Sequence, residues 1–111
     1  MTEALHTKHC TPCEGGTEPL DTARIQSLLK KIEDHWQVEE GQILVAEFAF
    51  KNYYETTAFV NAVAWIAHQE DHHPDISFGY KDCTVRYTTH AINGLSDNDF
   101  ICAAKIDALL S

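Results

Sequence analysis

The sequence predicts one α+β domain, a four-stranded antiparallel sheet with helices packed on one face, in the order α-β-β-α-β-β-α. Some segments repeat apolar residues every three or four positions, which is typical of helices, and others alternate apolar with polar residues, which is typical of strands. The strand segments come as two hairpins with a helix between them, which favours an antiparallel sheet covered by helices. A length of 111 residues with 44% hydrophobic residues fits one ordinary globular domain.

The first half of the domain is expected to hold a helix and a hairpin. Asp21 is a plausible N-cap for a helix that ends near residues 34–35. Strands are expected at 36–40 and 43–51, followed by a break at 52–54. The helix is expected to bury the apolar residues that recur at helical spacing, namely Ile25, Leu28, Leu29 and Ile32.

The second half repeats a helix, a hairpin and a helix. A long helix is expected at 55–71, and Pro74 is expected to stop it. Two strands are expected at 76–80 and 83–89, and Ser96 is a plausible N-cap of the last helix. The positions expected to face the core include Phe59, Val63, Ile66, Ala67, Cys83, Val85, Tyr87, Phe100, Ile101 and Ala104.

The domain is expected to span 20–111, after a flexible N-terminal tail at 1–19 that is marked by proline and glycine. The tail carries a Cys10-x-x-Cys13 motif with His6 and His9 nearby, so a zinc site is an alternative to a plain tail. These four ligands would be cramped, and the chain has no second C-x-x-C motif. The interpretation as a tail is therefore favoured.

Composition excludes several classes of function. Eight Lys and Arg against 17 Asp and Glu give a net charge of −9, which a nucleic-acid backbone would repel. No apolar run approaches the ~20 residues that a membrane helix needs, and the N-terminus lacks the apolar core of a secretory signal. We therefore expect a cytoplasmic protein with reduced cysteines, without direct contact to nucleic acid or membrane.

Seven histidines are a high count for this length, and three of them suggest one site. His72 and His73 follow the long helix, and Pro74 then breaks the helical geometry, so that the two rings can converge. His90 ends the second hairpin, which is expected to run back beside the same helix. Three imidazoles around one pocket would donate and accept protons near pH 7.

A metal site is the alternative interpretation of these histidines. His68 and His72 are four residues apart on one helical face, as in zinc peptidases. However, Gln69 stands where such a site needs its glutamate general base. The adjacent His72 and His73 are also awkward ligands for a single ion, and no metal is expected.

Several short motifs together resemble the signature of the pterin-4a-carbinolamine dehydratases. The pattern begins with His68 and continues, after three residues, with His-His-Pro at 72–74. An aromatic residue follows six positions after the proline, a histidine ten positions further, and an aspartate nine beyond that. The resemblance covers roughly residues 20 to 110, and the residues that complete it include Asp71, Tyr80, Thr88, Thr89, His90, Gly94, Leu95, Ser96 and Asp99.

The resemblance implies dehydration of 4a-hydroxytetrahydropterin to quinonoid dihydropterin, with the pterin as substrate and no further cofactor. Carried over by position, His73 would be the principal acid or base, and His72 and His90 would help to bind and protonate. Asp99 would orient a histidine or support its loop, although it also stands at the capping-box position after Ser96. The residues implied to bind substrate are Asp71, Pro74, Thr88, Thr89, Asp99 and Trp36.

The family resemblance also implies partners. It implies homodimers or homotetramers in which sheets join across subunits, as members of the family form. It also implies that the reaction product is recycled in support of an aromatic amino acid hydroxylase. Animal members also act as dimerisation partners of a homeodomain transcription factor. The alternative function is therefore a non-catalytic binding or regulatory partner of a hydroxylase or a transcription regulator.

Overall fold

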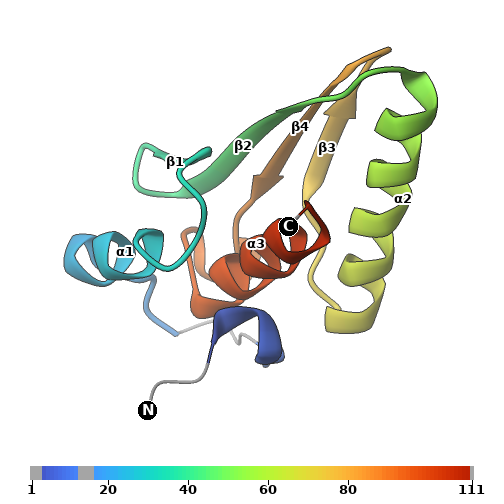
Figure 1. Ribbon diagram of the computed structural model, residues 1–111. Helices are drawn as coiled ribbons and strands as arrows, with labels where there is room; N and C mark the ends of the chain where they lie inside the picture. The colour runs from blue at the N-terminus through green and yellow to red at the C-terminus, as the bar shows by residue number, and fades with distance from the viewer. Residues whose placement is uncertain (1–3, 13–16, 111) are drawn as a thin grey trace.

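The computed structural model describes residues 4–12 and 17–110 and confirms the α+β class (Figure 1). One four-stranded sheet has the order β1-β2-β4-β3, and each neighbouring pair is antiparallel. Helices α2 and α3 contribute to the same core as the sheet. The elements are η1 (Leu5–Thr7), α1 (Thr22–Leu29), β1 (Trp36–Glu39), β2 (Ile43–Ala49), α2 (Tyr53–Glu70), β3 (Asp75–Phe78), β4 (Asp82–Tyr87), η2 (His90–Ile92) and α3 (Asp97–Leu110).

The alternating pattern of the two central strands decides which face of the sheet is buried. Along β4, Cys83, Val85 and Tyr87 are buried, whereas the residues between them are partly exposed. Their partners across β2 in the pairing register are Phe48, Ala46 and Leu44, which are also buried. The apolar face thus lies under the helices, as the period of two in the sequence predicts.

The first helix is shorter than the sequence predicts. Asp21 caps it as expected, because its carboxylate accepts the backbone N–H of Arg24 at 2.8 Å. The helix ends at Leu29 rather than near residues 34–35. The backbone N–H of Glu33 donates to the Asp107 carboxylate at 2.9 Å, which draws this segment toward α3 before β1 begins.

The long helix differs from the prediction at both ends. It starts at Tyr53, because the side chain of Asn52 accepts the N–H of Glu55 at 2.9 Å, so the expected break is a helix cap. It ends at Glu70, where Asp71 adopts a left-handed conformation with φ of 51°. This turn ends the helix, and Pro74 lies beyond it.

The part of the expected N-terminal tail that the structure describes packs against α3. Leu5 is 6% exposed and belongs to the core. Lys105 on α3 donates to the backbone carbonyl of His6 at 2.9 Å. Cys13, the second cysteine of the C-x-x-C motif, lies outside the described residues. Among the described helices, none has both the length and the apolar character needed to cross a membrane.

Candidate active site

Several parts of the chain line a cavity of about 580 Å³, and two segments among them carry histidines. The first follows the end of α2 and contributes His72 and His73, and the second follows β4 and contributes His90. The three imidazoles that the sequence singles out therefore line one cavity. Three more residues of the predicted site, Asp71, Thr88 and Thr89, line it as well.

His72 is held by a buried carboxylate behind the cavity. Its Nε2 lies 2.6 Å from Oδ1 of Asp99, and its ring stacks on that of Tyr87 at 5.7 Å with an interplanar angle of 7°. Asp99 is fully buried, and its Oδ2 accepts the hydroxyl of Thr89 at 2.9 Å and the N–H of Ser96 at 3.0 Å. The orientation of the His72 ring is thus fixed from two sides.

The environment of His72 favours its charged form. Burial by itself would lower the pKa of the imidazole, but the hydrogen bond and the negative charge of Asp99 outweigh it, so the pKa is raised. Only 12% of the His72 side chain is exposed. The site therefore has at its inner wall a histidine–carboxylate pair in which the charged form of the imidazole is favoured.

The other two rings are available to a ligand. Within the described chain, neither the His73 ring nor the His90 ring has a hydrogen-bond partner. His90 is exposed at the start of η2, in a loop closed by the backbone bond from Thr89 N–H to the Gly94 carbonyl at 2.9 Å. His73 is exposed and also borders a neighbouring groove. Both can exchange protons with a bound molecule.

Three residues of the predicted site do not line this cavity. Asp99 lies behind His72, and Pro74 lines the neighbouring groove together with His68. Trp36 is 3% exposed and belongs to the core, where its indole N–H donates to Asp107 at 2.9 Å. An aromatic residue at the start of a strand fits the sequence pattern whether it lies in the core or beside the cavity. The pattern therefore could not decide between these two places for Trp36.

The N-terminal segment supplies a wall of the cavity that the sequence pattern does not reveal. Cys10, Thr11 and Pro12 line it together with Asn98 of α3. The Asn98 amide pairs with the Thr11 backbone in both directions, at 3.1 Å to the N–H and 2.6 Å to the carbonyl. Bonds from a side chain to a distant backbone leave no periodic signal in the sequence, so nothing in the pattern could have revealed this wall.

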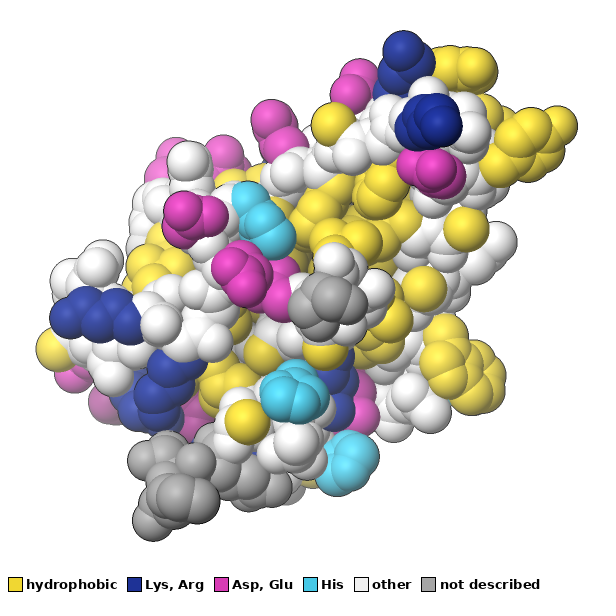
Figure 2. Space-filling model, viewed as in Figure 1, with side chains coloured by type: hydrophobic (Ala, Val, Ile, Leu, Met, Phe, Trp, Pro, Cys, Tyr) yellow, Lys and Arg dark blue, Asp and Glu magenta, His cyan; other side chains and the backbone are white. Residues whose placement is uncertain are grey.

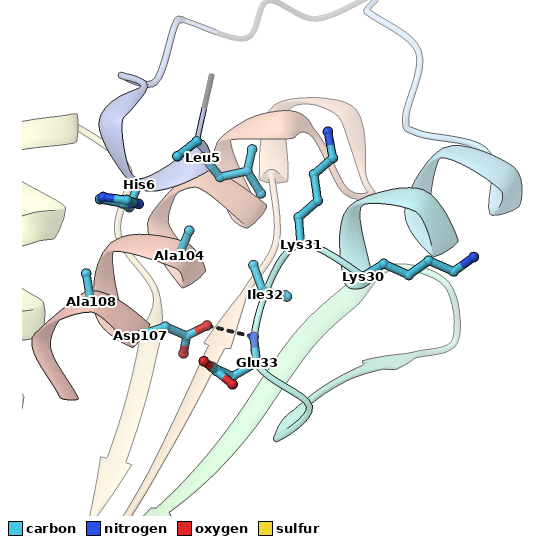
Figure 3. Close-up of a pocket in the computed structure, with 10 residues that line it drawn as sticks. Leu5, His6, Lys30, Lys31, Ile32, Glu33, Ala104, Asp107 and Ala108 are labelled. Atoms are coloured by element: carbon cyan, nitrogen blue, oxygen red, sulfur yellow. Dashed lines mark hydrogen bonds between the residues drawn. The ribbon is translucent and has the colours of Figure 1, made fainter. Parts of the chain in front are cut away.

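A larger cavity, of about 690 Å³, lies between η1, the turn after α1 and α3 (Figure 3). Its lining includes His6, Lys30 and Asp107, but none of the three imidazoles above. The Asp107 carboxylate is occupied in holding the fold, because it accepts from the Glu33 backbone and the Trp36 indole. The three imidazoles that the sequence singles out thus line the other cavity and not this one.

The described part of the chain offers no cluster of side chains for a metal ion. No group of three or more His, Cys, Asp or Glu side chains there is arranged to hold an ion. His68 contacts the Trp65 ring at 5.5 Å instead of sharing the cavity with His72.

Comparisons with known proteins agree with the signature. The family model described as "Pterin 4 alpha carbinolamine dehydratase" matches residues 18–109. A Nitrosomonas eutropha protein, provisionally named pterin-4-alpha-carbinolamine dehydratase, is 59% identical over 106 residues, covering 96% of this chain and 93% of the relative.

Two solved structures share the fold. The first, described as a transcriptional coactivator/pterin dehydratase from Brucella melitensis, is 27% identical with a TM-score of 0.79, over 85% of this chain and 100% of that one. The second, described as a pterin dehydratase-like RuBisCO assembly factor in the alpha-carboxysome, is 28% identical with a TM-score of 0.60, over 69% of this chain and 90% of that one. By sequence, by fold and by the histidines that share one cavity, the chain belongs to the pterin-4-alpha-carbinolamine dehydratase family.

Proposed function

We propose that this protein is a hydro-lyase that dehydrates a 4a-hydroxytetrahydropterin to the quinonoid dihydropterin by histidine acid–base catalysis. One observation carries the proposal. Three imidazoles line one cavity in a member of this family, and a buried carboxylate holds one of them. Such a cavity can protonate and deprotonate a bound molecule at the same time.

The reaction needs what these residues can supply. The substrate loses hydroxide from C4a and a proton from N5, and hydroxide is a poor leaving group unless an acid protonates it as it departs. An imidazolium can donate that proton, and a neutral imidazole can accept the one from N5. Loss of water is redox-neutral, so the reaction itself calls for no redox cofactor.

The surroundings of each ring support a division of roles. We assign the principal acid or base to His73, the position to which the family resemblance gives this role. Its ring, unlike that of His72, has no competing hydrogen-bond partner in the described chain. His72 is occupied by Asp99 on one nitrogen and contributes positive charge and position. His90 assists from the opposite segment, and Asp71 offers carboxylate oxygens that suit the N–H donors of a pterin ring.

Replacing His73 by Ala tests the proposal. We expect the catalysed decay of 4a-hydroxytetrahydropterin, followed by stopped-flow absorbance, to fall by about 10²–10⁴-fold. The control is His6→Ala, which removes an exposed imidazole outside the cavity and should retain full activity. Full activity of a folded His73→Ala protein would refute the assignment.

The product suggests the cellular setting. A quinonoid dihydropterin must be reduced before it can serve again as a hydroxylation cofactor, so we place this protein beside a reductase and an aromatic amino acid hydroxylase. We further propose that it works in the cytoplasm as a homodimer or homotetramer. Copurification with a hydroxylase would support this setting.

A second candidate is a non-catalytic binding role. It is favoured by the descriptions of the two structural neighbours, one of which names a coactivator and the other an assembly factor. A variant in which His72, His73 and His90 are all replaced separates the two functions. If this triple variant still complements a strain that lacks the protein, the binding role is favoured. If it no longer complements, catalysis is favoured.

A further inference from the structure

Two thiols from distant parts of the chain face each other at the edge of the cavity. Sγ of Cys10 lies 3.6 Å from Sγ of Cys102, although 92 positions separate the two residues. Cys10 is partly buried in the N-terminal segment, and Cys102 is fully buried on α3. Neither cysteine was expected to contact the other, because the sequence suggested a partner for Cys10 only at Cys13.

Leu5 anchors the N-terminal segment in the core, and hydrogen bonds with polar side chains position the part around Cys10. The Cys10 backbone N–H donates to Oε1 of Glu70 at 2.7 Å, and His9 contacts the other oxygen of the same carboxylate at 3.0 Å. Thr11 is paired with Asn98, as described above. These contacts bring the two sulfur atoms together while leaving Cys10 accessible from the cavity.

The electrostatics of the pair favour a thiolate at Cys102. The hydrogen bond from the Cys10 thiol lowers the pKa of Cys102, and the nearby His72 adds to this effect against the opposing effect of burial. The same hydrogen bond and burial raise the pKa of Cys10. A thiolate next to an accessible sulfur is the arrangement that resolves an oxidised cysteine into a disulfide.

We propose that Cys10 and Cys102 form a reversible oxidation site, whose disulfide ties the N-terminal wall of the cavity to α3. With hydrogen peroxide as oxidant, the Cys10 thiol first passes its proton across the 3.6 Å contact to Cys102. The Cys10 sulfur then attacks a peroxide oxygen and becomes a sulfenic acid, and the leaving hydroxide takes that proton back from Cys102 as one water. The Cys102 thiolate then attacks the Cys10 sulfur, so that the S–S bond forms, the S–O bond breaks and hydroxide leaves, which a proton from solvent converts into a second water. Overall, two thiols lose two electrons and two protons, which the peroxide takes up.

The step requires only a local movement. The two sulfur atoms must approach from 3.6 Å to the ~2.05 Å of a disulfide. The N-terminal segment can shift by that much, because its contacts near Cys10 are hydrogen bonds with polar side chains. Cys83 serves as an internal reference, because it is 1% exposed on β4 and has no thiol partner among the described residues.

Peptide mapping tests the proposal on the full chain. The reduced protein is treated with hydrogen peroxide at low protein concentration, alkylated, digested and analysed by mass spectrometry. We expect one linked peptide pair containing Cys10 and Cys102, two hydrogen atoms lighter than the free pair and restored by dithiothreitol. Cys13→Ser and Cys83→Ala should keep the link, and Cys10→Ser should abolish it.

Two outcomes would overturn the proposal. One is a link between Cys10 and Cys13 or between two copies of the chain, and the other is that Cys10 and Cys102 both remain free thiols. A second readout is hydrogen exchange of the Cys10 and Thr11 amides, which should slow by about tenfold or more in the oxidised form. Unchanged exchange would show that the wall is not tied down. Neither readout uses pterin, so both are independent of the proposed activity.

Discussion

At the residue scale, the carboxylate of Asp99 links the fold to the site. One oxygen meets His72, and the other accepts from Thr89 and from the backbone of Ser96 at the start of α3. The sequence offered two roles for this residue, orienting a histidine or completing a helix cap. The two oxygens fulfil both at once, so a change here should affect stability and site chemistry together.

Replacing Asp99 by Asn should change both the pKa of His72 and the stability of the fold, and measuring the two separately distinguishes the effect on site chemistry from the structural one. Without the negative charge, burial dominates and the pKa of His72 should fall below its ordinary value of 6.5. The free energy of unfolding should drop by about 1–3 kcal/mol, because buried donors lose a good acceptor. NMR titration of the His72 ring and urea denaturation measure the two quantities.

The matched control is Asp107→Asn, which removes another α3 carboxylate that a histidine contacts, here His35. It should also lower stability but leave the titration of His72 and the dehydratase activity unchanged. A titration of His72 that is the same in Asp99→Asn as in the parent protein would contradict the assigned role of Asp99.

The raised pKa of His72 also predicts how stability depends on pH. A group whose pKa is higher in the folded state binds its proton more tightly there, so its stabilising contribution is complete below the unfolded value of about 6.5. That contribution is lost as the pH rises from 6.5 through the folded pKa, with a slope of at most about 1.4 kcal/mol per pH unit. Urea denaturation across this window should show the decline, and Asp99→Asn should remove it. A decline that persists in Asp99→Asn would assign it to another group.

At the element scale, the turn after α2 brings the two adjacent histidines into the cavity. Asp71 is left-handed with φ of 51°, and the Ala67 carbonyl accepts the backbone N–H groups of both Asp71 and His72. The chain thereby reverses within one residue, and His72 and His73 leave the helix axis on the side of η2. The sequence predicted that Pro74 would end the helix, but the left-handed turn at Asp71 ends it earlier.

Substitutions at Asp71 should separate its backbone role from its side chain. Asp71→Gly should leave the free energy of unfolding unchanged or raise it, because glycine adopts a positive φ without steric cost. Asp71→Ala should lower it by about 1 kcal/mol, because a Cβ is strained in this region. If the carboxylate binds substrate, both variants should show a raised KM. A raised KM in Asp71→Ala alone would mean that only the turn matters.

The elements that could be predicted are those whose causes are local. Caps such as Asp21, and the alternation along β4, depend on neighbouring residues, and both are confirmed. The end of α1 and the wall around Thr11 depend on Asp107 and Asn98, which lie far away in the sequence. The three histidines could be proposed as a cluster because Pro74, the second hairpin and the family signature all pointed to them. The core position of Trp36 depends on distant partners and could not be foreseen.

At the scale of the whole molecule, the β3 edge of the sheet has no neighbouring strand among the described residues. β3 pairs with β4 on one side only. Beside it lie three partly exposed aromatic residues, Tyr53, Phe78 and Tyr80, with exposed fractions of 45%, 46% and 63%. The rings of Tyr53 and Tyr80 stack at 6.3 Å. Figure 2 shows hydrophobic side chains on the surface at the end of the molecule where α2 begins.

This open edge is where we expect a second copy of the chain to dock. Antiparallel pairing of β3 with its own copy would continue the sheet across two subunits around a two-fold axis and cover the aromatic group. Phe78→Arg should therefore convert the assembly measured by light scattering into monomers. The control Leu109→Arg changes a residue of similar exposure, 47%, on α3 and should leave the assembly unchanged. A monomeric parent protein, or an assembly that tolerates Phe78→Arg, would rule out this edge as the interface, because a buried arginine without a partner would cost several kcal/mol there.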